Sequence, residues 1–174
     1  MKTLYLLRHA KSSWADRSLR DYDRPLAPRG EKAAPAIGTE LVEQGWELDH
    51  VLCSSAQRTR DTWELMAPLF DPPPEVEYLS ELYLAAPETI LQLIRYQPDS
   101  VHALMVVGHN PGIADTASGL VKDGPEQMVE RMERKYPTAA LVRISVPVDE
   151  WRGVTWRSGR LDAFIRPKDL ANRA

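Results

Sequence analysis

Three short apolar runs constrain the fold of this 174-residue chain more than any other feature. They cover residues 3–7, 51–53 and 103–107, and each is too short for a helix but unbroken enough for a strand buried on both faces. Segments with helical apolar spacing follow all three runs, and another such segment covers residues 88–96. This alternation of strands and helices predicts a sheet with helices on both of its faces.

The pattern changes beyond Pro137. Residues 140–146, 154–156 and 161–165 have strand character without helices between them, which predicts antiparallel pairing at the end of the chain. The predicted fold class is therefore α/β, a three-layer α/β/α arrangement whose mixed, mostly parallel sheet has an antiparallel edge. We expect a single domain over residues 1–168 and a short tail over 169–174, because this length is that of one ordinary domain.

The predicted helices differ in how clearly they begin and end. Helical spacing over 29–45 suggests a helix kinked at Pro35 and ended by Gly45, and Ser54 and Ser55 are candidate N-caps for the helix after the second strand. Two shorter helices are expected over 113–121 and 126–135. Residues 8–28 have no clear periodicity and predict a long loop, which in a compact domain is often functional.

Charge and composition exclude several classes of partner. The net charge is −3, so the chain has no overall positive field for nucleic acid or an anionic membrane. The lone cysteine, Cys53, forms no internal disulfide and lies in an apolar run, where a buried inert thiol is expected. The N-terminal apolar run is too short for a signal or a membrane span. We therefore expect a cytoplasmic protein, with a monomer as the default.

Two of the three early strands end in a histidine. His9 follows the first run and His109 the third, and side chains just beyond the carboxyl ends of parallel strands converge on one crevice. The helix after the second strand carries Arg58 in its first turn, which brings a guanidinium and a positive helix end to the same crevice. His9, His109, Arg58 and the neighbouring Arg8 therefore predict an anion site.

Phosphate fits such a site best. Residues 8–32 hold seven Lys or Arg against four Asp or Glu, so the local charge is positive although the chain is acidic. Arginine matches phosphate oxygens with a planar fork of donors, and a neutral imidazole attacks phosphorus to give a covalent intermediate. Arg24 could bind phosphate or form an ion pair with Asp21 or Asp23, and both readings stay open. No histidine spacing typical of a metal site is present, so no metal or other cofactor is expected.

The ordered motifs resemble those of a known family. Leu7-Arg8-His9-Ala10, Ser54-x-x-x-Arg58-x-x-x-Thr62 and Gly108-His109-Asn110-Pro111 are similar, in order and spacing, to the signatures of the histidine phosphatase superfamily, also called phosphoglycerate-mutase-like. The run from Arg8 to Trp14 and the element Asp23-Arg24-Pro25-Leu26 are similar to its small SixA-type phosphohistidine phosphatase branch. The resemblance extends to about Lys168.

The resemblance implies a role for each matching residue. His9 would be the phosphorylated nucleophile, Arg8 and Arg58 the phosphate clamps, and His109 a donor to the phosphoryl oxygens. Arg24 would contact the same phosphate. Ala10 stands where many members have Gly, as is frequent in the small phosphatases of this branch.

Substrate class depends on whether a general acid is present. A phosphate monoester needs an acid to protonate its alkoxide, whereas the imidazole of phosphohistidine departs with little help. Glu81 is the one candidate acid, and the sequence does not establish it as one. We therefore expect a metal-independent phosphatase that hydrolyses the P–N bond of phosphohistidine on a protein through phospho-His9. The alternatives are a phosphatase of small phosphate monoesters and a non-catalytic module that binds phosphate.

Overall fold

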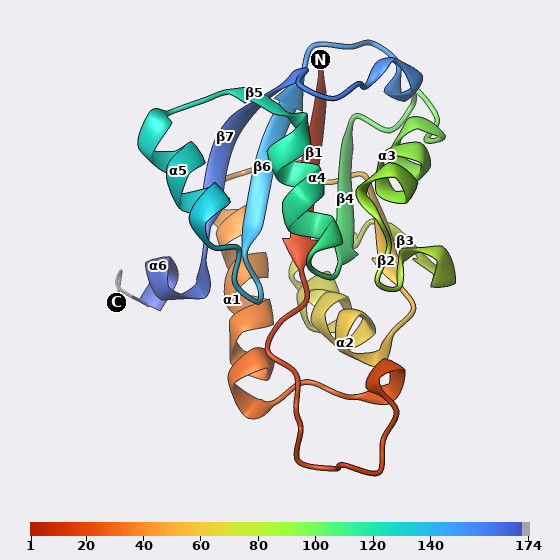
Figure 1. The fold of residues 1–174 in the computed structure, drawn as a ribbon, viewed down its shortest axis with the longest axis vertical. Coiled ribbons are helices and arrows are strands. Elements are labelled where there is room, and N and C mark those ends of the chain that lie inside the picture. The colour runs from red at the N-terminus through yellow and green to blue at the C-terminus, as the bar shows by residue number, and fades with distance from the viewer. Residues whose placement is uncertain (172–174) are drawn as a thin grey trace.

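A seven-stranded sheet forms the centre of the computed structural model, which describes residues 1–171 (Figure 1). The strands are β1 (Lys2–Arg8), β2 (His50–Ser54), β3 (Glu75–Leu79), β4 (Ala103–Gly108), β5 (Val121–Asp123), β6 (Leu141–Val146) and β7 (Gly159–Ile165). Their order is β3-β2-β4-β1-β6-β7-β5. Within the described residues, antiparallel pairing involves β6, which lies between β1 and β7, and the other neighbours pair in parallel. The expected α/β class with a mixed, mostly parallel sheet is confirmed.

Helices cover both faces of the sheet (Figure 1). One face carries α1 (Pro28–Glu43), α2 (Gln57–Met66) and α6 (Pro167–Ala171), and the other carries α3 (Pro87–Arg95), α4 (Gly112–Leu120) and α5 (Glu126–Arg134). Strand β1 shows why both layers are needed. Leu4 and Leu6 pack into one hydrophobic cluster and Tyr5 and Leu7 into the other, because successive side chains of a strand point to opposite faces. All four are fully buried.

The chain crosses from one face to the other where the two histidine motifs lie. β1 and β4 are parallel neighbours, with Arg8 paired to Gly108 at their carboxyl ends. The helix that follows β1 packs on one face of the sheet and the helix that follows β4 packs on the opposite face. Such a switch point opens a crevice at the carboxyl ends of the strands. The fold thus provides a ligand site next to residues 9 and 109.

Two sequence expectations about local structure are wrong. Residues 154–156 form no strand, because the single 3-10 turn Trp151–Gly153 precedes them and Trp151 is buried with its Nε1–H donating to the Val101 carbonyl at 2.7 Å. The N-cap of α2 is Ala56, not Ser54 or Ser55. The two serine hydroxyls contact His109 and Tyr22 instead.

The sequence did not predict the two edge strands, β3 and β5. β3 has the sequence Glu-Val-Glu-Tyr-Leu and β5 has three residues, so neither contains an apolar run. Three further 3-10 turns cover Asp21–Asp23, Ala67–Leu69 and Ser80–Leu82. Of the tail expected over 169–174, residues 169–171 complete α6 and 172–174 lie outside the described residues. Every helix within residues 1–171 is too short or too polar to span a bilayer.

Candidate functional site

His9 and His109 lie side by side, as the sequence predicts. The His9 backbone N–H donates to the Gly108 carbonyl at 3.0 Å, which continues the pairing of β1 with β4 by one residue. The two imidazole centroids are 5.4 Å apart, and both side chains are buried. The carboxyl ends of β1 and β4 therefore bring two imidazoles close enough to contact one small ligand.

The hydrogen bonds of His9 determine which ring nitrogen is free. Nδ1 lies 2.7 Å from the Ala10 carbonyl oxygen, and because a carbonyl only accepts, Nδ1 carries the proton of the neutral ring. The Ala10 N–H in turn donates to Thr62 Oγ1 at 3.0 Å, which holds this carbonyl segment in place. Nε2 is left with an unshared electron pair. His9 is therefore oriented as a nucleophile or base through Nε2.

Burial keeps His9 neutral. The pKa of the imidazole is lowered to about 3, chiefly by desolvation and further by the positive charges of Arg58, Arg8 and Arg24, while the hydrogen bond to the Ala10 carbonyl opposes this shift. His109 is in the same state: burial, His9 and Arg58 lower its pKa to about 3. Both rings are consequently neutral at neutral pH, although the guanidinium groups of Arg58, Arg8 and Arg24 surround His9.

Arg8 and Arg58 converge on the histidine pair, and each is held by a backbone carbonyl. Arg8 Nη1 donates to the Tyr136 carbonyl at 3.1 Å, and Arg58 Nη1 donates to the Asp21 carbonyl at 2.7 Å. Arg58 is the second residue of α2, in the first turn as expected. Burial, together with the charge of Arg58, lowers the pKa of Arg8. Two like charges held this close favour an anion between them.

Three buried nitrogen atoms around His9 have no hydrogen-bond partner among the described residues. They are Arg8 Nε, Arg58 Nε and His109 Nδ1. Buried polar groups are almost always paired, so each such atom calls for an explanation. Two of the three are guanidinium N–H donors. The third atom, His109 Nδ1, is a donor when it carries the ring proton. It does so if the Ser54 hydroxyl, which lies 2.7 Å from His109 Nε2, donates to Nε2. These three atoms are therefore candidate donors to an anion beside His9.

Asp21 contacts two further residues beside the histidines, whereas the sequence suggested only an ion pair with Arg24. Its carboxylate accepts hydrogen bonds from Tyr83 Oη at 2.5 Å, Arg58 Nη2 at 3.0 Å and Arg24 Nε at 3.2 Å. The bond from Tyr83 is the largest cause that lowers the pKa of Asp21 to about 2, and Arg58 adds to it. Asp21 is therefore an anion at neutral pH that orients arginines, and it has no proton to give.

An aromatic wall lies beside the histidines. The edge of Tyr83 meets the His109 ring with centroids 5.4 Å apart, and the same ring meets Tyr22 at 4.9 Å. Tyr22 Oη is 2.5 Å from Ser55 Oγ, which fixes this wall to the start of α2. No motif marked either tyrosine, because the contacts join segments that are far apart in the chain.

Arg24 is buried, and its positive charge acts on His9 while its N–H groups donate to other residues. It pairs with Asp21, with Nη2 and Oδ1 3.1 Å apart, and Nη1 donates to Ser12 Oγ at 2.8 Å. The Trp14 ring stacks on the Arg24 guanidinium, with Cζ of Arg24 3.5 Å from the ring centroid. The ion-pair reading of Arg24 thus has direct support, and Trp14 covers an arginine while remaining 66% exposed.

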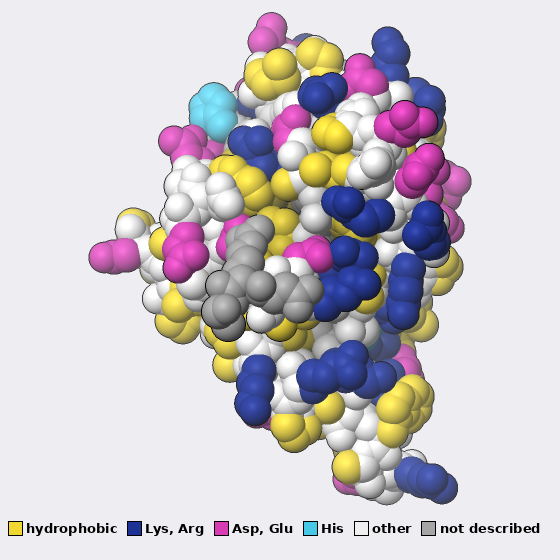
Figure 2. Space-filling view, turned by 90° about the vertical axis from the view of Figure 1, so that its left-hand side faces the viewer, with side chains coloured by type: hydrophobic (Ala, Val, Ile, Leu, Met, Phe, Trp, Pro, Cys, Tyr) yellow, Lys and Arg dark blue, Asp and Glu magenta, His cyan; other side chains and the backbone are white. Residues whose placement is uncertain are grey.

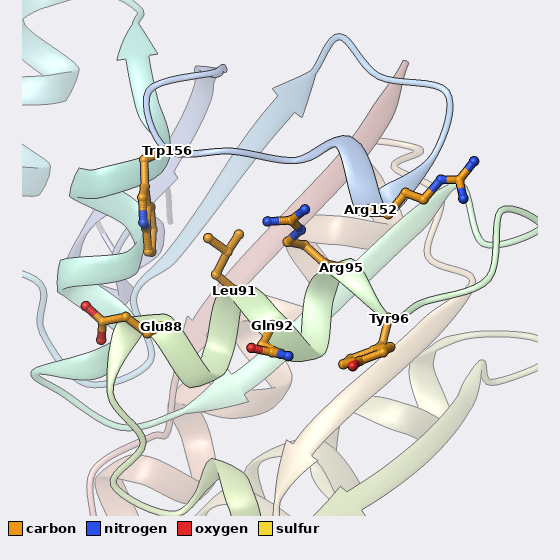
Figure 3. A pocket seen from close by; sticks show the side chains of 7 residues that line it. All are labelled: Glu88, Leu91, Gln92, Arg95, Tyr96, Arg152 and Trp156. Carbon is orange, nitrogen blue, oxygen red and sulfur yellow. The ribbon is translucent and has the colours of Figure 1, made fainter.

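Other candidates lie apart from this centre. Glu81 is exposed, and its carboxylate accepts a hydrogen bond from Ser80 Oγ at 3.1 Å. The Cys53 thiol is buried and burial raises its pKa, which confirms an inert thiol. A cavity of about 680 Å³ opens along α3, between Leu91 and the residue that follows the helix, Tyr96, on one side and the segment that contains Arg152 and Trp156 on the other (Figure 3). None of its lining residues belongs to the histidine site.

Comparisons with known proteins agree with this geometry. Residues 4–103 match the model of the histidine phosphatase superfamily, branch 1. An uncharacterized protein of Mycobacterium tuberculosis is 37% identical over 164 residues, which cover 93% of this chain and 100% of that protein.

Two solved structures share the whole fold. A candidate phosphohistidine phosphatase SixA from Nakamurella multipartitia has a TM-score of 0.81 at 30% identity, covering 95% of this chain and 96% of that one. A candidate SixA from Agrobacterium tumefaciens has a TM-score of 0.77 at 30% identity, covering 95% and 98%. The chain therefore belongs to the histidine phosphatase superfamily, in its SixA-type branch.

Proposed function

We propose that this protein is a phosphohistidine phosphatase that transfers the phosphoryl group to His9 and then to water, without a metal ion. The observation that carries the proposal is the state of His9: a neutral imidazole whose Nδ1 proton is held by the Ala10 carbonyl and whose Nε2 electron pair is free. A ring oriented in this way needs no general base before it attacks phosphorus.

The first step forms one P–N bond and breaks another. The Nε2 electron pair of His9 attacks phosphorus, and the bonding pair of the substrate's P–N bond leaves with the substrate imidazole. If the second nitrogen of that imidazole is protonated, the leaving group departs as neutral imidazole. Water then attacks the phosphorus of phospho-His9 and loses one proton to solvent, and the P–N bonding pair returns to Nε2, which releases hydrogen phosphate and restores neutral His9.

The unpartnered donors would stabilise the transferring group. Arg8 Nε, Arg58 Nε and His109 Nδ1 are three buried nitrogens that can donate to the equatorial oxygens of the phosphoryl group. Because Asp21 and backbone carbonyls already orient the guanidinium groups, little reorganisation is needed when charge develops. Arg24 would act through its charge and by holding Asp21.

The carboxylates favour P–N over P–O cleavage. Asp21 is the carboxylate that contacts the site residues, and its pKa of about 2 keeps it ionised. Glu81, the acid considered from the sequence, is exposed and contacts Ser80. A monoester leaving group would need a proton that neither residue is placed to give, whereas an imidazole leaving group would not. The Tyr22–Tyr83 wall offers that flat ring an aromatic neighbour.

Initial rates on a phosphohistidine protein and on an alkyl phosphate monoester such as glycerol phosphate test the proposal, because the alkoxide of such a monoester needs an acid. We expect faster turnover of phosphohistidine, and loss of both activities in His9→Ala. Faster turnover of the monoester, with a large rate loss in Glu81→Gln, would instead support a phosphatase of small metabolites. Phosphate binding without turnover of either substrate would support a binding module.

A further inference from the structure

A basic pocket of about 220 Å³ adjoins the histidine site. Its lining residues are Lys11, Arg29, Ala33, Lys135, Pro137, Thr138, Arg166, Pro167 and Lys168. They come from the loop after β1, the first part of α1, the segment before β6 and the segment around α6. Five of these nine side chains are cationic and none is acidic. Lys and Arg side chains gather on the face of the molecule that carries α6 (Figure 2).

The pocket shares backbone with the phosphoryl site. Lys11 is two residues from His9, and the Ala139 N–H, next to the lining residue Thr138, donates to the His9 carbonyl at 2.9 Å. Tyr136 lies between the lining residues Lys135 and Pro137, and its carbonyl accepts the hydrogen bond from Arg8. The basic pocket therefore lies next to the backbone that positions His9 and Arg8, where residues that flank a bound phosphohistidine would come close to it.

Close packing fixes the position of two of these cations. A Cβ atom on Gly30 would lie 2.2 Å from the Lys11 carbonyl oxygen, so α1 packs against the Lys11 backbone at a distance that a side chain would prevent. The Ala27 N–H donates to the same carbonyl at 2.9 Å. Lys11 and Arg29 are thereby held on adjoining walls.

Most of the positive charge in the pocket is not neutralised by the protein. Arg166 pairs with Asp169 at 2.7 Å. Among residues 1–171, no carboxylate forms a salt bridge with Lys11, Arg29, Lys135 or Lys168. All four side chains are exposed. A chain with net charge −3 that gathers unpaired cations beside its proposed active site presents a surface complementary to carboxylates.

We infer that this pocket binds acidic side chains of a protein substrate next to its phosphohistidine. The inference rests on the proposed function and defines the substrate further: a phosphohistidine in an acidic surface segment. Four unpaired cations spread over several walls exceed what one phosphate requires, since the phosphoryl group has its own donors at Arg8, Arg58 and His109. The pocket therefore acts as a specificity element that contacts the protein and not the reacting atoms.

A pair of synthetic peptides tests the inference. Both contain phosphohistidine, flanked on each side by glutamates in one peptide and by glutamines in the other. We expect wild type to have the lower KM for the glutamate peptide. In the double variant Lys135→Glu/Lys168→Glu, KM for that peptide should rise about five- to tenfold, the size expected for reversing two exposed ion pairs. Turnover at saturation and the KM for the glutamine peptide should stay unchanged.

The variant Lys122→Glu/Arg95→Glu is the matched control. It changes the net charge equally, at exposed cations that lie outside the pocket and form no salt bridge within residues 1–171. It should leave the preference for the glutamate peptide intact. Equal KM values for the two peptides in wild type, or an equal loss in the control variant, would overturn the inference while leaving phosphohistidine turnover in place.

A binding measurement keeps the test independent of catalysis. Titration of the 15N-labelled protein with the unphosphorylated glutamate peptide should shift the backbone amides of the non-proline residues in 135–138 and 166–168. If wild type turned over neither peptide, the proposed function would fail and these shifts would still report on the pocket. Shifts confined to other surfaces, or none in these two segments, would refute the acidic docking site.

Discussion

At the scale of single residues, the site depends on histidines that stay neutral among positive charges. Arg58, Arg8 and burial all act in the same direction on His9, and Asp21 supplies the negative charge that keeps the guanidinium groups together. The Ala10 carbonyl cannot prevent the pKa from falling, but it decides which nitrogen holds the proton. Charge state and tautomer therefore have separate structural causes.

The imidazole of His9 should titrate far below the usual value. In the phosphate-free protein we expect a pKa of about 3 for both His9 and His109, since burial disfavours their charged forms. NMR of the ring C–H and nitrogen signals between pH 7 and pH 4 should show little change for either ring. A midpoint near 6.5 for His9 would contradict this picture of the buried pair.

Arg58→Lys should be a damaging substitution although it preserves charge. Arg58 uses both Nη atoms on Asp21 and leaves Nε for the phosphoryl group, and a single ammonium cannot make these contacts together. We expect kcat/KM for phosphohistidine to fall by about 10²- to 10³-fold. Arg60→Lys serves as the control, because Arg60 lies two residues further along α2 and does not take part in these contacts. A loss of less than about threefold in Arg58→Lys would remove Arg58 from the proposed clamp.

At the scale of elements, close contact between α1 and the loop after β1 positions both the phosphoryl site and the basic pocket. Two backbone hydrogen bonds close the base of the long loop. The Ser13 N–H donates to the Pro25 carbonyl at 2.8 Å, and the Ala27 N–H donates to the Lys11 carbonyl at 2.9 Å. This pairing turns the unpatterned segment between β1 and α1 into a fixed wall, which carries Asp21 and Arg24 to the histidines.

Gly30→Ala should test that contact. Its Cβ would meet the Lys11 carbonyl at 2.2 Å, and because the obstacle is backbone, the loop would have to move. We expect the free energy of unfolding to fall by about 1 to 3 kcal/mol in urea titrations. Gly153→Ala is the control, since its Cβ would meet Val148 at an ordinary 3.5 Å. Equal stability of the two variants would show that the loop is not held by this approach.

The sequence predicted the helices with apolar periodicity and the strands that are apolar runs, and it missed the strands that have neither pattern. β1, β2 and β4 are buried on both faces and appear as apolar runs, whereas β3 alternates acidic and apolar residues at the sheet edge and β5 is too short for a pattern. The segment 154–156 has strand composition, but its neighbour Trp151 is anchored to Val101 and the chain turns there. Long-range contacts outweighed local preference in this segment.

At the scale of the whole molecule, the neutral histidine pair links stability to pH. The unfolded chain binds protons on these rings below pH 6.5, while the folded pKa values are about 3. Between these values the unfolded state holds more protons, so stability falls as pH falls. Asp21 acts in the same direction at lower pH, because its folded pKa of about 2 lies below its usual value.

Urea unfolding at pH 7 and pH 5 should show this loss. Each proton bound only by the unfolded chain costs about 1.4 kcal/mol per pH unit, so the free energy of unfolding should fall by about 2 to 4 kcal/mol at pH 5. His9→Asn should show a smaller decrease, because one of the two protons is removed from the linkage. Identical decreases in wild type and variant would rule out His9 as a source of the pH dependence.

Motifs located the histidines and arginines of the site, but not the residues that organise them. His9, His109, Arg8 and Arg58 follow strand ends or begin a helix, so topology alone brings them together. Asp21, Tyr22 and Tyr83 reach the site from a loop and a 3-10 turn with no periodicity, and their contacts become visible only in three dimensions. The sequence thus predicted which histidines and arginines lie together, and the structure added how they are oriented.

The measurement that bears most directly on the mechanism is the location of the trapped phosphoryl group. Rapid quenching of the protein with a 32P-labelled phosphohistidine substrate, followed by peptide mapping, should place an acid-labile, alkali-stable label on the peptide that contains His9. The label should be absent in His9→Ala. Label on any other residue, or turnover that persists in His9→Ala, would contradict transfer through His9.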